Sequence, residues 1–203
     1  MLNLSNVFFA YPHCAVLRDF SAQLAPGVAM VLGGDGRGKT TVLELLAGVL
    51  APDAGRLQLG NVFLDEQPEA YRQQVFWKDP RSTAHDALRV TDYLQSVQRA
   101  YPGFDEALLT EMIEGLSLGP QLHKNLFMLS TGSKRKVWIA AAAASGAQLT
   151  LLDGPFVSLD QASINFVLQV LTVAAKQSVR IWVVADYVPL GDLALTTLIN
   201  LGD

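Results

Sequence analysis

The sequence has 203 residues and lacks the features that mark several protein classes. Cys14 is its only cysteine, which excludes a disulfide framework and a zinc site made of cysteines. Acidic residues outnumber basic ones, 19 against 15, so the net charge of −4 argues against nucleic acid as a partner. The three histidines do not have the spacing of metal ligands. We therefore expect a reduced protein without a zinc site.

Long apolar runs, heptad arrays and internal repeats are absent as well. The longest stretch without a charged residue or a histidine is Val137–Leu152, 16 residues, whereas a membrane-spanning helix needs about 20. No cation precedes Arg18, so the first residues lack the basic start of a signal peptide. We expect a cytoplasmic protein that does not cross a bilayer on its own. Half of the residues are hydrophobic, which predicts a large core or an apolar contact with a partner.

The order of strand and helix patterns predicts one α/β domain over residues 1–203. Its mixed-sheet core is expected from residues 1–82 and 146–203 and begins with antiparallel strands. Residues 83–145 are expected to form a helical subdomain with helices at Thr91–Tyr101, Asp105–Leu116 and Thr131–Ser145. The other strand-like segments are Leu2–Tyr11, Val16–Leu24, Gly27–Gly34, Arg56–Leu64, Gln73–Trp77, Leu149–Asp153 and Arg180–Ala185, and the other helical ones are Lys39–Leu50 and Gln161–Gln177.

The segment GGDGRGKTT, residues 33–41, fulfils the phosphate-loop pattern G-x-x-x-x-G-K-[ST] between a predicted strand and a predicted helix. Glycines let backbone N–H groups close around phosphate oxygens, and the helix N-terminus adds its dipole. Lys39 can bridge the β- and γ-phosphates, and the Thr40 hydroxyl can bind Mg²⁺. The predicted nucleotide-binding residues of this loop are Gly33, Gly34, Asp35, Gly36, Arg37, Gly38, Lys39, Thr40 and Thr41.

The apolar segment LTLLD ends at Asp153, which is how a buried parallel strand brings a carboxylate to the edge of a sheet. With the phosphate loop present, Asp153 is the expected second partner of Mg²⁺. Gly154 follows, where many ATP-hydrolysing proteins carry a second carboxylate. These residues indicate a nucleotide-binding protein and leave kinases, GTPases, motors and transport ATPases open.

The segment LSTGS, Leu129–Ser133, with the basic Lys134–Lys136 after it, resembles the LSGGQ signature of ABC-type ATPases. Ser130 precedes Asp153 by 23 residues, the usual spacing in that family. Asp35 stands at the asparagine of the family's phosphate loop. Val157–Asp160 resembles its D-loop. Tyr11 resembles the aromatic that stacks on adenine, and Pro52–Gly60 the turn and strand after the first helix. The resemblance covers essentially the whole chain.

The resemblance implies a P-loop NTPase fold of the ABC type and the ATP-binding subunit of an ABC membrane transporter, with ATP and Mg²⁺ as cofactors. Two such subunits, as a homodimer or heterodimer, would hold ATP between the phosphate loop of one and the signature of the other. The implied signature residues, acting in trans, are Leu129, Ser130, Thr131, Gly132 and Ser133. The helical subdomain would face an integral membrane permease, with the subunit on the inner face of the cell membrane.

Several positions depart from the family where hydrolysis is concerned. Gly154 and Ala185 stand at the usual positions of the glutamate that polarises water and the histidine that contacts the γ-phosphate. Lys78 aligns with the glutamine that senses Mg²⁺, and Ser133 replaces the glutamine of the signature. Since general-base catalysis contributes roughly 10²–10⁴ in rate, we expect ordinary ATP binding with slow hydrolysis.

Two carboxylates are weak candidates for orienting water in place of the missing groups. Asp160 is rather expected at an interface, and Asp186 as a solvated residue at a strand end. Lys78 is expected as a surface cation and the basic cluster Lys134–Lys136 as a solvated helix face. Two other functions stay open: a nucleotide-dependent regulator without useful ATPase turnover, and a soluble ABC-type protein of translation or DNA repair.

Overall fold

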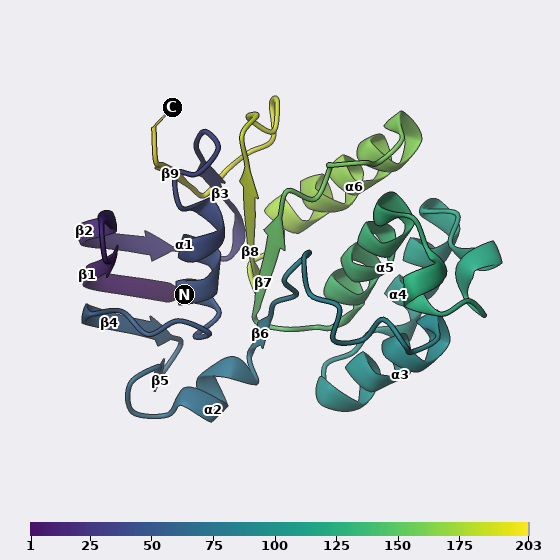
Figure 1. Cartoon of the computed structure of the whole chain (residues 1–203), viewed down its shortest axis with the longest axis horizontal. Helices are drawn as coiled ribbons and strands as arrows, with labels where there is room; N and C mark the ends of the chain where they lie inside the picture. The colour runs from purple at the N-terminus through teal and green to yellow at the C-terminus, as the bar shows by residue number, and fades with distance from the viewer. Residues whose placement is uncertain (203) are drawn as a thin grey trace.

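The computed structural model describes residues 1–202 and contains two β-sheets (Figure 1). The first is antiparallel with the order β2-β1-β4-β5, and its strands are β1 (Leu2–Tyr11), β2 (Cys14–Leu24), β4 (Ala54–Leu59) and β5 (Val62–Phe63). The second is parallel with the order β6-β7-β8-β3-β9, and its strands are β6 (Val75–Phe76), β7 (Leu149–Asp153), β8 (Ile181–Asp186), β3 (Gly27–Leu32) and β9 (Thr197–Asn200). The antiparallel strands predicted at the N-terminus are therefore confirmed, and they form a sheet of their own.

Helix α1 (Lys39–Leu46) lies between the two sheets (Figure 1). The parallel strands are buried on both faces, and their side chains divide alternately between two cores. In β3, Ala29 and Val31 face the core that contains α1 and the antiparallel sheet, whereas Val28 and Met30 face the helices on the other side. This sandwich fixes the start of α1, and with it the phosphate loop, against β3.

The second face of the parallel sheet is covered by α5 (Thr131–Ala144) and α6 (Gln161–Ala175). Helices α3 (Val90–Ala100) and α4 (Glu106–Gly115) pack with α5 on the side remote from the antiparallel sheet (Figure 1). Two short 3₁₀ segments, Gly119–Gln121 and Leu126–Met128, lead into α5. The three predicted helices of residues 83–145 are thus confirmed, with ends within a residue or two of the prediction.

Four segments differ from the prediction. Residues 56–64 are not one strand, because Gly60 adopts φ +59° and turns the chain back into the β4–β5 hairpin. The predicted helix over residues 39–50 ends at Leu46, since Gly48 adopts φ +68° and closes the helix. The short helix α2 (Pro68–Arg72) and the strand β9 were not predicted.

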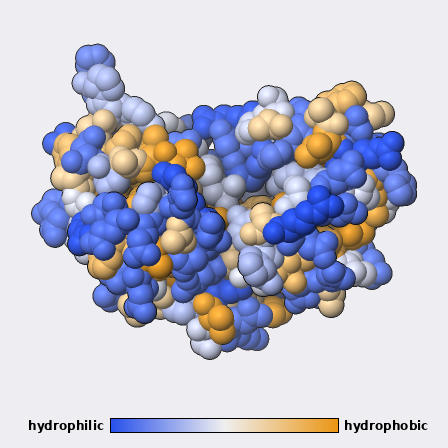
Figure 2. All heavy atoms as spheres, turned by 90° about the horizontal axis from the view of Figure 1, so that it is seen from below, coloured by the Kyte–Doolittle hydropathy of each residue, from blue (hydrophilic) through white to orange (hydrophobic). Residues whose placement is uncertain are grey.

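The surface carries its apolar residues in separate patches among hydrophilic ones on the face drawn in Figure 2. Residues 1–202 include no helix with the length and apolarity that a bilayer crossing requires. Much of the high hydrophobic content is accounted for by the two buried cores on either side of the parallel sheet. Two large apolar side chains, Phe127 and Met128, are more than half exposed just before the signature.

Candidate nucleotide site

The site lies where three neighbouring parallel strands end at the same edge of the sheet. Strand pairing sets Asp153 beside Ala185 and Leu32 beside Asp186, so β7, β8 and β3 end together. Ligands of open α/β sheets bind at this edge. A cavity of about 390 Å³ occurs here. It is lined by Asp35, Gly36, Gly38, Lys39, Thr40, Thr41, Asp153, Gly154, Val157, Ala185, Asp186 and Tyr187.

The loop at residues 33–38 lies between β3 and α1, the strand and helix that its sequence predicts on either side. The Lys39 ammonium donates hydrogen bonds of 2.7 Å to the carbonyl oxygens of Gly33 and Gly34, and so it lies across the loop. Gly38 adopts φ +90°, and a Cβ there would overlap the Val16 side chain of β2. Only glycine fits this position. Arg37 is exposed, and its backbone N–H is directed to the Gly34 carbonyl at 3.4 Å.

Two oxygens at the base of the loop suit a magnesium ion. The Thr40 hydroxyl donates a 2.7 Å hydrogen bond to Asp153 Oδ2, which joins the start of α1 to the end of β7. Mg²⁺ prefers such hard oxygens and is usually held by one or two protein groups together with phosphates and water. No group of three or more His, Cys, Asp or Glu able to hold a metal occurs within residues 1–202. The donor set therefore fits a nucleotide-bound Mg²⁺ rather than a resident metal centre.

Tyr11 ends β1 beside the phosphate loop. Its hydroxyl lies 3.3 Å from the Thr41 hydroxyl, and its ring packs edge-on against Phe9 with centroids 5.2 Å apart. The side chain remains 45% exposed. An aromatic ring that is fixed at one edge and open on a face can stack on a base. The predicted adenine contact is thus compatible with the position of Tyr11.

At the edge of the cavity opposite the phosphate loop, the two positions that depart from the family, Gly154 and Ala185, have no polar side chain. Ala185 is fully buried, and its carbonyl accepts a 2.8 Å hydrogen bond from the Gly154 N–H. Gly154 adopts φ +50°, in the left-handed region that favours glycine. The backbone turn at Gly154 is therefore one that glycine adopts more readily than a residue with a side chain.

The Arg135 side chain stabilises the backbone turn at Gly154. It donates hydrogen bonds of 2.8 and 2.9 Å to the carbonyl oxygens of Gly154 and Val157. The expectation of a solvated basic face is wrong for Arg135, which is 8% exposed and whose Nε has no hydrogen-bond partner within residues 1–202. Burial lowers the pKa of its guanidinium. Its spacing of three residues from the buried Gly132 and four from the buried Ile139 places it on the buried face of α5, a signal that the sequence contained.

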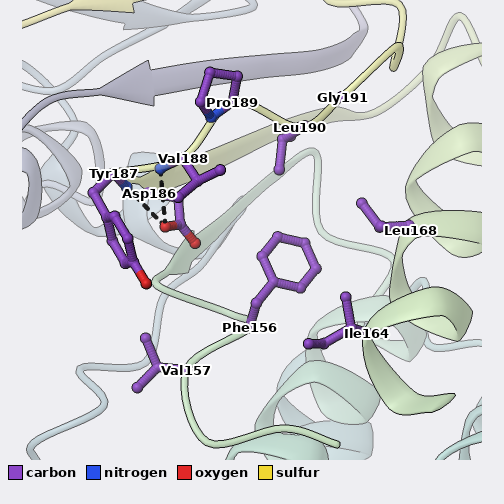
Figure 3. Close-up of a pocket in the computed structure, with 10 residues that line it drawn as sticks. All are labelled: Phe156, Val157, Ile164, Leu168, Asp186, Tyr187, Val188, Pro189, Leu190 and Gly191. Carbon is purple, nitrogen blue, oxygen red and sulfur yellow. Dashed lines mark hydrogen bonds between the residues drawn. The ribbon is translucent and has the colours of Figure 1, made fainter. Parts of the chain in front are cut away.

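Asp186 also differs from its prediction as a solvated carboxylate. The residue is only 5% exposed. Its Oδ1 accepts hydrogen bonds from the N–H groups of Tyr187, at 2.7 Å, and Val188, at 3.4 Å (Figure 3). Burial raises the pKa of the carboxyl, which the two N–H groups and Lys39 lower and Asp153 raises further. The uninterrupted apolar run Ile181–Ala185 before it is the signal that could have indicated a buried strand end.

The signature lies outside the cavity of its own chain, since none of its five residues lines it. Exposed Ser130 caps α5 by accepting the Ser133 N–H at 3.2 Å. A Cβ at Gly132 would overlap the Ser158 carbonyl oxygen, so the signature packs directly on the D-loop-like segment. Leu129 is buried and Thr131 is exposed.

Asp160, the other weak candidate for a base, is engaged in structural contacts. Its Oδ1 caps α6 by accepting the Ser163 N–H at 2.9 Å, and its Oδ2 pairs with Lys136 at 2.7 Å. The hydrogen bond from Lys136 holds the pKa of this carboxyl far below its usual range. Asp160 does not line the cavity. It ties α5 to α6 instead.

Lys78 lines a small cavity together with Asp153 but does not line the candidate nucleotide cavity. Its ammonium is 5.8 Å from the centre of the Trp138 ring, a cation–π contact. Burial lowers the pKa of Lys78, and Asp79 and Asp86 oppose that shift. The side chain is half-buried rather than the surface cation that we expected. No hydrogen bond joins it to Thr40 or Asp153 within the described chain.

Comparison with known proteins gives the family. The family described as ABC transporter matches residues 17–157. The taurine import ATP-binding protein TauB of Yersinia pestis bv. Antiqua (strain Antiqua) is 34% identical over 168 residues, which cover 79% of this chain and 63% of the relative. The ABC-type transporter ATP-binding protein EcsA of Bacillus subtilis (strain 168) is 26% identical over 87% of this chain and 73% of its own. The chain thus spans just under two thirds of the length of the TauB relatives.

Solved structures agree on the fold. A putative ABC transporter ATP-binding protein from Pyrococcus furiosus superposes with a TM-score of 0.80 at 23% identity, covering 98% of this chain and 96% of that one. The ATP-binding cassette MJ0796, a dimer in a post-hydrolysis state bound to ADP and Pi, superposes with a TM-score of 0.76 at 19% identity, covering 93% and 88%. The predicted P-loop fold of the ABC type is therefore confirmed. With a family match over most of its length and a phosphate loop, strand-end aspartate and signature in the family's order, the chain belongs to the ABC transporter family.

Proposed function

We propose that this chain is the ATP-binding subunit of an ABC importer, binding MgATP at an interface with a second ATP-binding subunit and driving a membrane permease. One observation carries the proposal. A single cavity brings together the Lys39 ammonium and the Thr40–Asp153 pair, while Ser130 and Thr131 of the signature are exposed outside it. This arrangement supports binding of a nucleotide that a second subunit must cover.

Different residues of the cavity would bind different parts of the nucleotide. Lys39 would exchange its two backbone carbonyl partners for phosphate oxygens, and charge-assisted bonds of this kind are the stronger ones. Thr40 and Asp153 would hold Mg²⁺, which neutralises phosphate charge when bound. Tyr11 would stack on the base. The remaining residues of Gly33–Thr41 would offer backbone N–H groups to the phosphates.

A second subunit supplies what this cavity lacks. Exposed Ser130 and the N-terminus of α5 can meet a phosphate only across an interface, where the helix dipole favours an anion. Gly132 against Ser158 and Lys136 against Asp160 hold the signature and the D-loop-like segment together as one surface. Both a homodimer and a heterodimer are compatible with this surface. In a heterodimer, a partner with the glutamate would form one complete hydrolytic site.

We propose that the membrane partner binds the helical subdomain, residues 83–145. Phe127 and Met128, which are 61% and 60% exposed directly before the signature, are the apolar side chains that we assign to this contact. A permease there would hold the subunit on the inner face of the cell membrane. Because the TauB relatives are named for taurine import, a small organic solute is the first cargo class to test.

Hydrolysis in this chain is proposed to be slow. Neither Gly154 nor Ala185 offers a group that can polarise water. The loss of a general base costs roughly 10²–10⁴ in rate, whereas the phosphate loop is complete, so affinity should be spared.

The test is purification of the tagged chain from detergent-solubilised membranes in the presence of MgATP. We expect it to carry along an integral membrane protein, identified by mass spectrometry, and any second ATP-binding subunit. The Lys39→Met variant controls for nucleotide-dependent assembly. A chain that binds MgATP but never associates with a membrane protein would contradict the transporter role.

A further inference from the structure

The nucleotide cavity contains three carboxylates, and each has a different environment. Asp153 is bonded to Thr40 at the proposed metal position, and Asp35 is exposed on the loop. Asp186 is the third, and it is buried at the end of β8 next to the two family positions that have lost their side chains. It is therefore the carboxylate of the cavity that is not already assigned to binding.

The Asp186 side chain is held in one orientation. Its Oδ1 is fixed by the N–H groups of Tyr187 and Val188, so the turn that follows β8 is built on this oxygen. No hydrogen bond from residues 1–202 reaches the other oxygen, Oδ2. Figure 3 shows that Oδ2 points away from the turn, toward the space between Tyr187 and Phe156. One oxygen thus positions the group and the other is available to a water molecule.

The surroundings of Asp186 favour a proton acceptor. Behind it lies a second cavity of about 340 Å³, lined mainly by apolar side chains such as Phe156, Ile164 and Leu190 (Figure 3). Asp186, Val157 and Tyr187 form the wall between the two cavities. A carboxylate against an apolar wall is a stronger base than one in water, and its burial shifts the pKa upward accordingly. The charged groups that act on it are Lys39, Asp153 and the buried Arg135.

We propose that Asp186 Oδ2 orients the attacking water in this chain and accepts its proton, in place of the absent glutamate. Asp186 takes the proton as the water oxygen bonds to the γ-phosphorus and the bond from that phosphorus to the bridging oxygen breaks, leaving the electron pair on ADP. Lys39 stabilises the charge that develops on the phosphates. This inference rests on the proposed function, because it requires ATP in the cavity.

The variant Asp186→Asn tests the role with little disturbance of the turn. Asparagine keeps an Oδ1 that can accept the two backbone N–H groups but replaces Oδ2 by a donor. Asp192→Asn, at an exposed aspartate six residues later, is the matched control. Three properties are measured for each protein: single-turnover hydrolysis of ATP, the Kd of ATP, and thermal stabilisation by ADP with aluminium fluoride, which mimics the phosphoryl group in transfer.

We expect Asp186→Asn to slow hydrolysis by about 100-fold or more while the Kd of ATP changes by less than about threefold. Stabilisation by ADP with aluminium fluoride should fall as well, since the mimic requires the water-binding group, and Asp192→Asn should match the wild type. Unchanged hydrolysis in Asp186→Asn would overturn the inference, as would a wild type without measurable hydrolysis. Failure of the wild type to bind ATP would instead overturn the proposed function.

A structure of the wild type with ADP and aluminium fluoride decides the matter if Asp186→Asn does not fold. A water within about 3.2 Å of Asp186 Oδ2 and in line with the mimic supports the role, whereas a water held only by other groups contradicts it.

Discussion

The two halves of the nucleotide cavity differ in how completely they are built. In the phosphate loop, Lys39, Thr40 and Gly38 are each fixed by contacts, and Asp153 joins them from the neighbouring strand. On the opposite edge, Gly154 and Ala185 contribute backbone and a methyl group. In the proposed function, nucleotide binding depends on the phosphate-loop half and hydrolysis on the opposite edge. The binding half can therefore be complete although the hydrolytic edge has lost side chains.

The largest expected effect is on ATP affinity and comes from Lys39 in the phosphate-loop half of the cavity. Lys39→Met removes the ammonium that bridges phosphate oxygens, and hydrogen bonds to charged groups contribute about 1.5–3 kcal/mol each. We expect a loss of roughly 100-fold in ATP affinity, measured by isothermal titration calorimetry. Lys176→Met, at an exposed lysine after α6, is the control and should bind as the wild type does. Equal affinity in Lys39→Met and wild type would show that the loop is not the binding half.

Tyr11 tests whether the binding half extends to the base. Stacking of a base on an aromatic ring contributes about 1–3 kcal/mol, so Tyr11→Ala should weaken ATP binding roughly tenfold. Tyr11→Phe keeps the ring and loses only the hydroxyl near Thr41, and it should bind almost normally. Affinity for inorganic triphosphate should be the same in all three proteins. A similar loss for triphosphate would mean that Tyr11 supports the loop rather than the base.

The variant Gly154→Glu tests directly the cavity edge that has lost its side chains. At φ +50° a side chain is strained, so we expect the variant to lose about 1–2 kcal/mol of unfolding free energy and to hydrolyse ATP less than about tenfold faster than the wild type. Stability is measured by urea unfolding and hydrolysis in single turnover. Gly119→Glu adds the same charge where a Cβ has open space, and it should change neither property much. A gain of 100-fold in rate would show that only a side chain is missing.

The smallest effect concerns stability at Asp186. Its pKa is raised in the folded protein, so the folded state holds the proton more tightly and ionisation destabilises the fold as pH rises. Asp186→Asn removes that cost. The variant should therefore melt at a higher temperature than the wild type at pH 7, and the difference should vanish below about pH 4, where the carboxyl is protonated in both states. A lower melting temperature at pH 7 would indicate that the charged carboxylate stabilises the turn after β8.

The sequence predicted the phosphate-loop half of the cavity more fully than the hydrolytic edge. Gly33–Thr41 is local: one segment between a strand and a helix determines its own shape. Asp153 could be assigned because the apolar run before it predicts a buried strand, which the structure confirms as β7.

Contacts between residues that lie far apart in the sequence could not be predicted from local patterns. The burial of Asp186 depends on a loop that folds back over the strand end, and the burial of Arg135 depends on carbonyl groups 19 and 22 residues away. Gly154 reads as a missing glutamate in the sequence, but its left-handed backbone appears only when β7, β8 and α5 are assembled. Likewise, the position of Lys78 over the Trp138 ring joins residues that lie far apart in the sequence.

We propose that this chain binds ATP through its complete phosphate loop and hydrolyses it slowly, because the opposite edge of the cavity lacks the glutamate and the histidine. Single-turnover hydrolysis, with protein in excess over labelled MgATP, measures this directly beside an ABC cassette that keeps both the glutamate and the histidine. We predict that all the ATP is bound and is hydrolysed at least about 100-fold more slowly than by that cassette. Hydrolysis within about tenfold of the intact cassette would contradict the account.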